Sequence, residues 1–429
     1  MTLLLLKEVD NMLKHTRISD SEVYEIVEAE LNRQEHNIEM IASESTAPLE
    51  VMELSGSVFT NKTLEGYPGA RFQAGSHEAD KLEILGIERA KELFGAEHVN
   101  LQVYSGSTAN YGVYAAVLKP GDKVLSMRLD QGGHLTHGSP ANFLSKVYEY
   151  HFYGVNPDTE MIDLDALEEK AKEIMPKLII AGGSSYPRLI DYERIGQIAK
   201  SVGALFMVDM AHVSGLVAAG VIPSPVPYAD FVTSSTTKTF CGPRSGFILC
   251  KNEHAKMLDK GVFPGSIGSM HLTTMAAKVW SFKYAASEEF KNIMKQILVN
   301  AKTLAEELTR HGFRIVSGTT DNHIVMVDLR PKNISGKLFQ NALDKVGITV
   351  NKNQIPFDPA SPFVTSGVRI GVTSITQRGL KEAEVKVIAE IMNQVASAPE
   401  DEVNLADCKN KAEALIAKFP LYPVDSFVD

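Results

Sequence analysis

The run ALFMVD at residues 204–209 is an apolar stretch that ends on the carboxylate of Asp209. A second apolar run, FVTSSTTK at residues 231–238, ends on the amino group of Lys238. Both read as buried strands, and side chains at the carboxyl ends of such strands lie where open α/β sheets bind ligands. A lysine there can condense with an aldehyde, and an acid can hold the protonated nitrogen of a pyridine ring. Because pyridoxal phosphate needs that pair, the two runs favour an α/β protein that binds this cofactor.

Each of these side chains also has an ordinary explanation. A lysine at a strand end commonly extends its amino group to solvent, and an acid there commonly caps the next helix. His212, three residues after Asp209, either contacts the cofactor ring or is an ordinary polar neighbour. The two explanations for Lys238 differ in whether its amino group is buried. Burial lowers the pKa of a lysine, and the neutral amine attacks an aldehyde more readily.

Length and composition restrict the class of protein. At 429 residues the chain exceeds the usual size of one hydrophobic core, so we expect two or more domains. The net charge of −10 argues against nucleic acid as a partner, since phosphate backbones are bound by clustered Lys and Arg. Three widely spaced cysteines indicate a reducing compartment. The leucine run at residues 3–6 is too short for a signal sequence or a membrane span, so we expect a cytoplasmic protein without a membrane partner.

The order of apolar and helical stretches predicts three parts. Residues 1–47 would form an N-terminal arm. Residues 48–295 alternate apolar runs with helical stretches, which predicts a large domain with a mostly parallel sheet and helices on both faces. Residues 296–429 would form a smaller α+β domain at the C-terminal end.

Periodicity predicts three long helices within these parts. An amphipathic, acid-rich helix is expected over residues 20–40. Residues 278–310 lack Pro and Gly and keep a helical spacing of apolar side chains, so we expect one long helix there. Another amphipathic helix is expected over residues 379–396, opened by Gly379.

Two glycine-containing segments carry side chains suited to a ligand. Residues 105–110, SGSTAN, open a helix with small and hydroxyl side chains, which suits a phosphate but equally suits a plain helix cap. The loop GGHLTHG at residues 132–138 would stack His134 on a pyridine ring or offer His134 and His137 to a metal. We disfavour the metal because the loop lacks the further ligands that a closed site needs.

Two charged residues outside these loops are candidates for contacts with the substrate. Arg369 has a forked guanidinium that fits an amino-acid carboxylate, and it fits a structural salt bridge equally well. Glu65 begins the turn EGYPG at residues 65–69 and has a carboxyl suited to proton transfer, although a polar residue beside a turn needs no such role. Neither pattern decides between its two explanations by itself.

These segments together resemble the serine hydroxymethyltransferase family, nearly from end to end. The matching strings are IASE (41–44), EGYPG (65–69), GGHLTHG (132–138), VDMAH (208–212), SGTTDNH (317–323), TVNKN (349–353) and SPFVTSG (361–367). Several are specific to the family, so the resemblance implies the α/β fold of a fold-type-I pyridoxal phosphate-dependent transferase. It also implies interconversion of serine and glycine, with tetrahydrofolate as co-substrate, by a homodimer with shared active sites.

The resemblance implies a role for each matching residue. Lys238 would attach the cofactor, Asp209 would pair with its pyridine nitrogen, and His134 would stack on its ring. The other implied cofactor contacts are Ser105, Gly106 and Ser107 at the phosphate, Ser184 and His212 beside the phenolic oxygen, and Gly268. The implied substrate contacts are Ser43, Arg369 and Glu65, the last as a proton-transfer acid that reaches the neighbouring subunit's site. The implied folate contacts are Leu129, Gly133, Leu135 and Asn353.

The departures from the family pattern are concentrated near this site. Thr237 stands before the lysine, where the family usually has a histidine, and Ser45 follows Ser43-Glu44, where it usually has an asparagine. Three positions that usually carry tyrosine are Thr63, Phe72 and Gln73. Each lost hydrogen bond to a charged group costs about 1.5–3 kcal/mol, enough to change the substrate or the use of folate.

These departures leave several activities open besides serine and glycine interconversion. One alternative is a folate-independent aldolase, transaldolase or transferase that acts on another β-hydroxy amino acid, such as threonine or α-methylserine. Another is a protein that binds pyridoxal phosphate without turnover. An aminotransferase fits less well, because the matching strings are too extensive.

Overall fold

A seven-stranded sheet forms the centre of the computed structural model, which describes residues 13–422. Its strands are β4 (His98–Asn100), β5 (Lys123–Met127), β6 (Glu149–Tyr153), β7 (Leu178–Ala181), β8 (Leu205–Asp209), β9 (Phe231–Ser235) and β10 (Gly246–Cys250). They lie in the order β4-β10-β9-β8-β7-β5-β6, and only β10 runs antiparallel to its neighbours. The prediction of a mostly parallel sheet is therefore confirmed.

The two runs that suggested a cofactor site are adjacent strands. Strand β8 pairs in parallel with β9, and Asp209 is in register with Thr233. Strand β9 ends at Ser235, so Lys238 follows the strand by three residues. Both charged side chains therefore lie at the same edge of the sheet, where its carboxyl ends meet.

Helices cover both faces of this sheet, as the continuous apolar runs require. One face packs on α6 (Gly106–Val117) and α10 (Ala255–Val262), and the other on α5 (His77–Phe94), α7 (Leu164–Ile174), α8 (Tyr192–Ser201) and α11 (Leu272–Ala285). Successive residues of β7 alternate between the two layers. Ile180 is buried in the same cluster as Val113 of α6, and Ile179 in the same cluster as Ile198 of α8.

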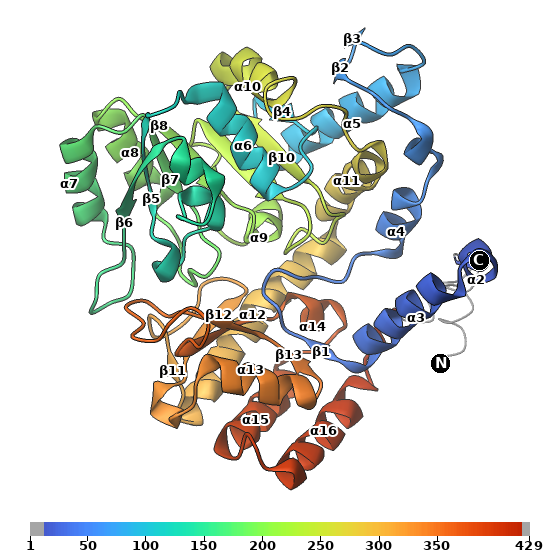
Figure 1. The fold of residues 1–429 in the computed structure, drawn as a ribbon, viewed down its shortest axis with the longest axis vertical. Helices are drawn as coiled ribbons and strands as arrows, with labels where there is room; N and C mark the ends of the chain where they lie inside the picture. Colours follow the sequence, from blue (N-terminus) through green and yellow to red (C-terminus); the bar gives the residue numbers. More distant parts are fainter. Residues whose placement is uncertain (1–12, 423–429) are drawn as a thin grey trace.

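A second, antiparallel sheet lies below the first in Figure 1. Its strands β11 (Arg314–Ile315), β12 (Ile324–Asp328), β14 (Asn351–Asn353) and β15 (Gly367–Gly371) pack with α13 (Gly336–Lys345), α15 (Glu382–Ser397) and α16 (Glu402–Ile416). Helix α12 (Glu288–Arg310) connects the two parts, so the boundary expected at residue 296 falls inside a continuous helix.

The N-terminal segment crosses from one part to the other. Helices α2 (Lys14–Ser19) and α3 (Ser21–His36) extend away from the body, as Figure 1 shows. Strand β1 (Ile38–Glu39) then pairs with β13 (Ile348–Thr349), and α4 (Leu49–Ser55) and the hairpin of β2 (Gly66–Tyr67) and β3 (Ala70–Arg71) lead to α5. The leucine run at residues 3–6 lies outside the described residues. None of the helices between residues 13 and 422 combines the length and apolar character that a membrane span needs.

Two helix predictions need correction. The single helix expected over residues 278–310 is two helices, because the hydroxyl of Ser287 accepts a hydrogen bond from the Phe290 backbone N–H and starts α12 anew. Gly379 does not open the following helix. It has a φ of +94° and follows the end of the short α14 (Thr373–Gln377), while α15 begins at Glu382.

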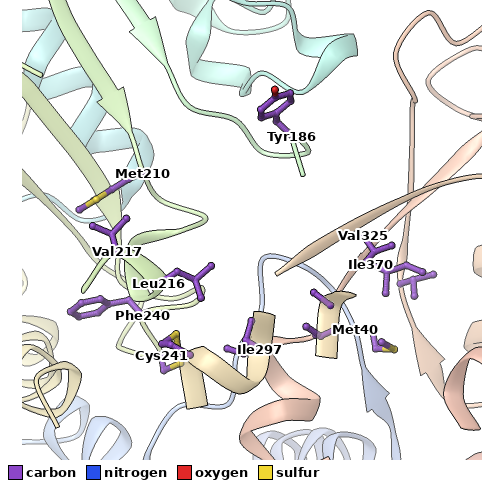
Figure 2. Close-up of a cluster of buried hydrophobic side chains, with 14 of the residues drawn as sticks. Met40, Tyr186, Met210, Leu216, Val217, Phe240, Cys241, Ile297, Val325 and Ile370 are labelled. Atoms are coloured by element: carbon purple, nitrogen blue, oxygen red, sulfur yellow. The ribbon is translucent and has the colours of Figure 1, made fainter. Parts of the chain in front are cut away.

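One apolar cluster joins the two parts (Figure 2). It contains Leu216 and Phe240 from the large part, Ile297 of α12, and Val325 and Ile370 of the smaller sheet. All five are fully buried. Because packed interiors resist deformation, this shared core fixes β15 relative to the carboxyl edge of the large sheet.

Candidate active site

A cavity of about 340 Å³ lies at the carboxyl edge of β8 and β9. It is within the usual size range of small-molecule sites. Of the residues predicted from sequence, it is lined by Ser43, Ser105, Gly106, Ser107, His134, Ser184, Asp209, His212 and Lys238. The fold thus brings to one place residues that are spread over nearly 200 positions of the chain.

Asp209 is held as a carboxylate at the end of β8. Its Oδ2 accepts hydrogen bonds from Asn110 Nδ2 at 2.9 Å and from His137 Nε2 at 3.2 Å, and its Oδ1 accepts one from the Ala211 backbone N–H at 3.0 Å. Burial alone would raise its pKa, but the hydrogen bond and charge of His137, together with the charges of His134 and Lys238, outweigh burial and lower the pKa of Asp209. A buried acid that stays ionised suits a cationic partner in the cavity.

Asn110 and His137 were not predicted as partners of Asp209. Asn110 is fully buried, and its amide also donates to Thr136 Oγ1 at 2.8 Å and accepts from Thr233 Oγ1 at 2.6 Å. It lies on α6 one turn after Ser107, on the helix face that the N-terminal serines share. This spacing of polar side chains was the one signal in the sequence that could have indicated Asn110 as a site residue.

Lys238 has the environment of a nucleophilic amine. The side chain is half-buried, and it makes no hydrogen bond with any residue between 13 and 422. Burial lowers the pKa of Lys238 to about 8, while the charge of Asp209 opposes that change and Arg369 and Arg244 add to it. The explanation in which the amino group simply extends into bulk solvent does not fit a half-buried lysine that lines this cavity.

The N-terminus of α6 supplies an anion site. Ser105 Oγ accepts from the Thr108 backbone N–H at 3.2 Å, and the Ser105 N–H donates to Thr108 Oγ1 at 2.8 Å. This capping box occupies the Ser105 hydroxyl. The N–H groups of the first helical residues, Gly106 and Ser107, have no partner within the helix, and both residues line the cavity.

The glycine loop holds His134 as a neutral ring. The Thr136 backbone N–H donates to His134 Nδ1 at 3.2 Å, so this nitrogen is unprotonated. Burial, reinforced by His137, lowers the pKa of His134 to about 4. Gly133 allows the loop to lie close to β5, because a Cβ there would be 2.3 Å from the Met127 carbonyl oxygen. The loop therefore presents a flat, uncharged ring to the cavity.

His212 is paired with a second buried histidine. Its Nδ1 lies 3.3 Å from His323 Nε2, which is also 3.1 Å from the Ala42 carbonyl oxygen. The carbonyl requires a proton on His323 Nε2, so His212 Nδ1 is an acceptor. Burial, followed by the charge of Lys238, holds the pKa of His212 well below its ordinary value. Both rings are neutral.

Arg369, on β15 of the smaller sheet, contacts a residue that lines the cavity. It donates from Nη1 to the Ser184 carbonyl oxygen at 2.6 Å and from Nε to Asn351 Oδ1 at 3.1 Å. Burial lowers its pKa to about 10, which still leaves a cation at neutral pH. No carboxylate of residues 13–422 forms an ion pair with it, so the salt-bridge explanation is not what this structure contains. Its charge is available for an anionic ligand.

The fold does not bring every predicted residue to this cavity. Glu65 and Gly268 line a separate, open pocket with Phe72 and Phe263. The folate candidates Leu129 and Leu135 are exposed on short 3-10 turns, Leu129–Gln131 and Leu135–His137, on either side of Gly133. Asn353 lies on β14, where its amide donates to the Gln354 carbonyl oxygen at 2.7 Å.

Three side chains of the kinds that bind metals lie close together here. His134, His137 and Asp209 place possible ligand atoms within 4.8 Å of one another. The third of these residues could not be expected from spacing, since Asp209 is far from the loop in the chain. Here the His137 ring and the Asp209 carboxylate meet through a hydrogen bond of 3.2 Å.

Comparison with known proteins agrees with this geometry. The sequence model of the family described as serine hydroxymethyltransferase matches residues 16–392, which is most of the chain. The match confirms the α/β fold-type-I architecture expected from the sequence, with its mostly parallel central sheet. It also indicates a pyridoxal phosphate-dependent transferase. The chain belongs to the serine hydroxymethyltransferase family.

Proposed function

We propose that this protein transfers a hydroxymethyl group between serine and tetrahydrofolate and so interconverts serine and glycine. The observation that supports this most strongly is the cavity in which Lys238, Asp209 and the α6 N-terminus converge, with Arg369 of the smaller sheet bonded to the Ser184 carbonyl at its wall. An amine, a buried carboxylate, an anion site and a free guanidinium are the groups that a pyridoxal phosphate enzyme for amino acids needs.

The residues present fit pyridoxal phosphate by the chemistry of their donors. Gly106 and Ser107 would hold the phosphate, Asp209 the pyridine nitrogen, and Lys238 the aldehyde carbon. The neutral His134 ring suits stacking on the cofactor ring, and Ser184 and His212 would flank its phenolic oxygen. When bound, this cofactor withdraws electrons from a bond at the amino acid's Cα.

The chain's own residues would orient the substrate and move its protons. Arg369, with Ser43, would bind the amino-acid carboxylate and thereby fix which bond at Cα breaks. The lowered pKa of Lys238 keeps a usable fraction of the amine neutral near physiological pH, so it can take up and return a proton at Cα. Glu65 would manage the proton on the serine hydroxyl.

The position of Glu65 supports a homodimer with shared active sites. It lines an open pocket that is separate from the cavity of its own chain. A carboxylate so placed would act at the site of a second copy of this chain, which would also receive Gly268. Leu129, Gly133, Leu135 and Asn353 would contact the folate. We further propose a cytoplasmic location.

A second candidate is a related reaction on a bulkier β-hydroxy amino acid, such as α-methylserine. Ser45 Oγ donates to the Thr237 carbonyl oxygen at 2.7 Å, and both positions usually carry a larger side chain in the family. Thr237, Ser43, Glu44 and Arg244 line the cavity and also an adjoining one of about 660 Å³. The smaller side chains therefore leave room beside Lys238 for an additional substituent.

One experiment separates these candidates. With tetrahydrofolate present as acceptor, the cofactor-loaded protein is given serine, threonine or α-methylserine, each carbon-labelled at the departing group, and the loss of that group from the amino acid is followed. Faster cleavage of serine supports the first candidate, and faster cleavage of α-methylserine or threonine supports the second. Lys238→Ala should abolish each reaction, and Lys302→Ala, at an exposed position of α12, should abolish none. Retained cofactor without cleavage of any substrate would contradict both.

A further inference from the structure

The segment that carries Glu65 is a rigid hairpin. Strands β2 and β3 pair through it, and the Phe72 backbone N–H donates to the Glu65 carbonyl oxygen at 3.2 Å. Arg71 anchors the hairpin through a side chain that is only 3% exposed. Its guanidinium binds Asp80 at 2.8 Å and also Glu83. These contacts tie the hairpin of residues 65–73 to α5.

The side-chain amide of Gln73 makes two hydrogen bonds with Glu65, and we call this pair of bonds the clasp. Gln73 Oε1 accepts from the Glu65 backbone N–H at 2.8 Å, and Gln73 Nε2 donates to Glu65 Oε2 at 3.0 Å. The second contact is a hydrogen bond to a carboxylate, the stronger kind. The other oxygen, Oε1, faces Gly268 and is 3.7 Å from where a Cβ on that glycine would lie. One carboxylate oxygen is held by Gln73, and the other accepts no hydrogen bond from a side chain or backbone within residues 13–422.

We infer that Gln73 is a positioning residue that holds Glu65 through its side-chain amide. The inference rests on the proposed function, in which Glu65 handles the proton of the substrate hydroxyl. A primary amide provides a donor and an acceptor in a fixed relation and neither gains nor loses a proton at physiological pH. Glu65 is then the only proton carrier in the pair, and its Oε1 is the atom that exchanges the proton.

Gln73 is one of the departures from the family pattern. Considered from sequence alone, Gln73 counts only as a missing tyrosine, a lost donor. In the structure the same residue supplies a donor to the carboxylate of Glu65. The departure therefore replaces one group that contacts the site with another, and it need not reduce turnover.

Two variants test the clasp. Gln73→Leu removes both polar atoms at similar size, whereas Gln73→Glu keeps the acceptor for the Glu65 N–H and replaces the donor by a second carboxyl oxygen. Gln197→Leu is the matched control, because Gln197 Nε2 lies 3.5 Å from Glu193 Oε1 on an exposed helix surface away from the site. Each variant is made in the wild-type and in the Glu65→Gln background.

Each variant has its own expected effect on kcat. Gln73→Leu should lower kcat for the preferred substrate about tenfold to a hundredfold, the usual effect of losing a hydrogen bond to a charged group. In the Glu65→Gln background the same change should cause no further loss. Gln73→Glu should be impaired at pH 8 and should recover as the pH falls to 6, because protonation of one of two adjacent carboxyls restores a donor. Gln197→Leu should behave like wild type.

Hydrogen exchange gives a readout that does not depend on activity. The Glu65 backbone N–H should exchange faster in Gln73→Leu and at the wild-type rate in Gln197→Leu. Unchanged exchange in Gln73→Leu would overturn the clasp and leave the proposed function standing. An equal loss of kcat in both backgrounds would overturn the positioning role. Full activity of Glu65→Gln would instead contradict the proposed role of Glu65, and the inference would fall with it.

Discussion

The amino group of Lys238 should lose its proton near pH 8, because burial in the cavity lowers its pKa to about 8 from an ordinary value of 10.5. Lysine is reactive only when neutral, so reactivity rises as the pH passes upward through the pKa. At pH 7.5, a pKa of about 8 leaves roughly a quarter of the side chains neutral, and a pKa of 10.5 leaves roughly one in a thousand. Lys238 should therefore carry roughly 200 times more neutral amine at this pH than the same side chain with an ordinary pKa.

Competitive labelling of the cofactor-free protein with acetic anhydride, read by peptide mass spectrometry between pH 6 and 11, measures this directly. Exposed Lys302 in the same sample is the internal reference. Asp209→Asn should move the midpoint of Lys238 labelling to lower pH, because the carboxylate favours the ammonium form. Cofactor-loaded protein should be protected from labelling at Lys238. A Lys238 profile that coincides with that of Lys302 would refute the argument from burial.

Three further changes test other parts of the site. Asn110→Leu removes a donor to the buried cavity carboxylate and should weaken cofactor binding about tenfold to a hundredfold in an absorbance titration; unchanged affinity would contradict the contact. Gly133→Ala places a Cβ 2.3 Å from a backbone carbonyl and should lower the free energy of unfolding in urea by about 1–3 kcal/mol, whereas Gly56→Ala, with its nearest atom at 3.7 Å, should change it by less than about 1 kcal/mol. Arg369→Lys loses the planar fork and should raise KM for the amino acid about tenfold without changing the cofactor spectrum; an unchanged KM would mean that the guanidinium does not bind substrate.

The parts of the fold that depend on local pattern could be predicted from the sequence. The apolar runs at residues 204–209 and 231–238 predicted two buried strands, which the structure shows to be neighbours, and the alternation around them predicted a mostly parallel sheet. Such runs are visible because both faces of a central strand are buried. The convergence of Asp209 and Lys238 follows from strand topology, which places carboxyl ends at one edge.

The features that depend on single side chains meeting in space could not be predicted from the sequence. The break between α11 and α12 rests on one hydroxyl, that of Ser287, in a sequence that is otherwise helical in pattern. The partnership of Asn110 with Asp209 joins positions 99 residues apart. The clasp of Gln73 on Glu65 exists only because the hairpin folds residue 73 back onto residue 65. Such contacts leave no periodic pattern of apolar residues in the sequence.

The most direct test of the central claim is the rate at which the cofactor-loaded protein forms glycine from serine, with and without tetrahydrofolate. The proposed function predicts rapid formation of glycine that depends on tetrahydrofolate and disappears in Lys238→Ala. Formation of glycine at the same rate without tetrahydrofolate would contradict hydroxymethyl transfer to folate and assign the cavity to an aldolase. No glycine under either condition, from protein that holds its cofactor, would contradict the claim that this site acts on serine.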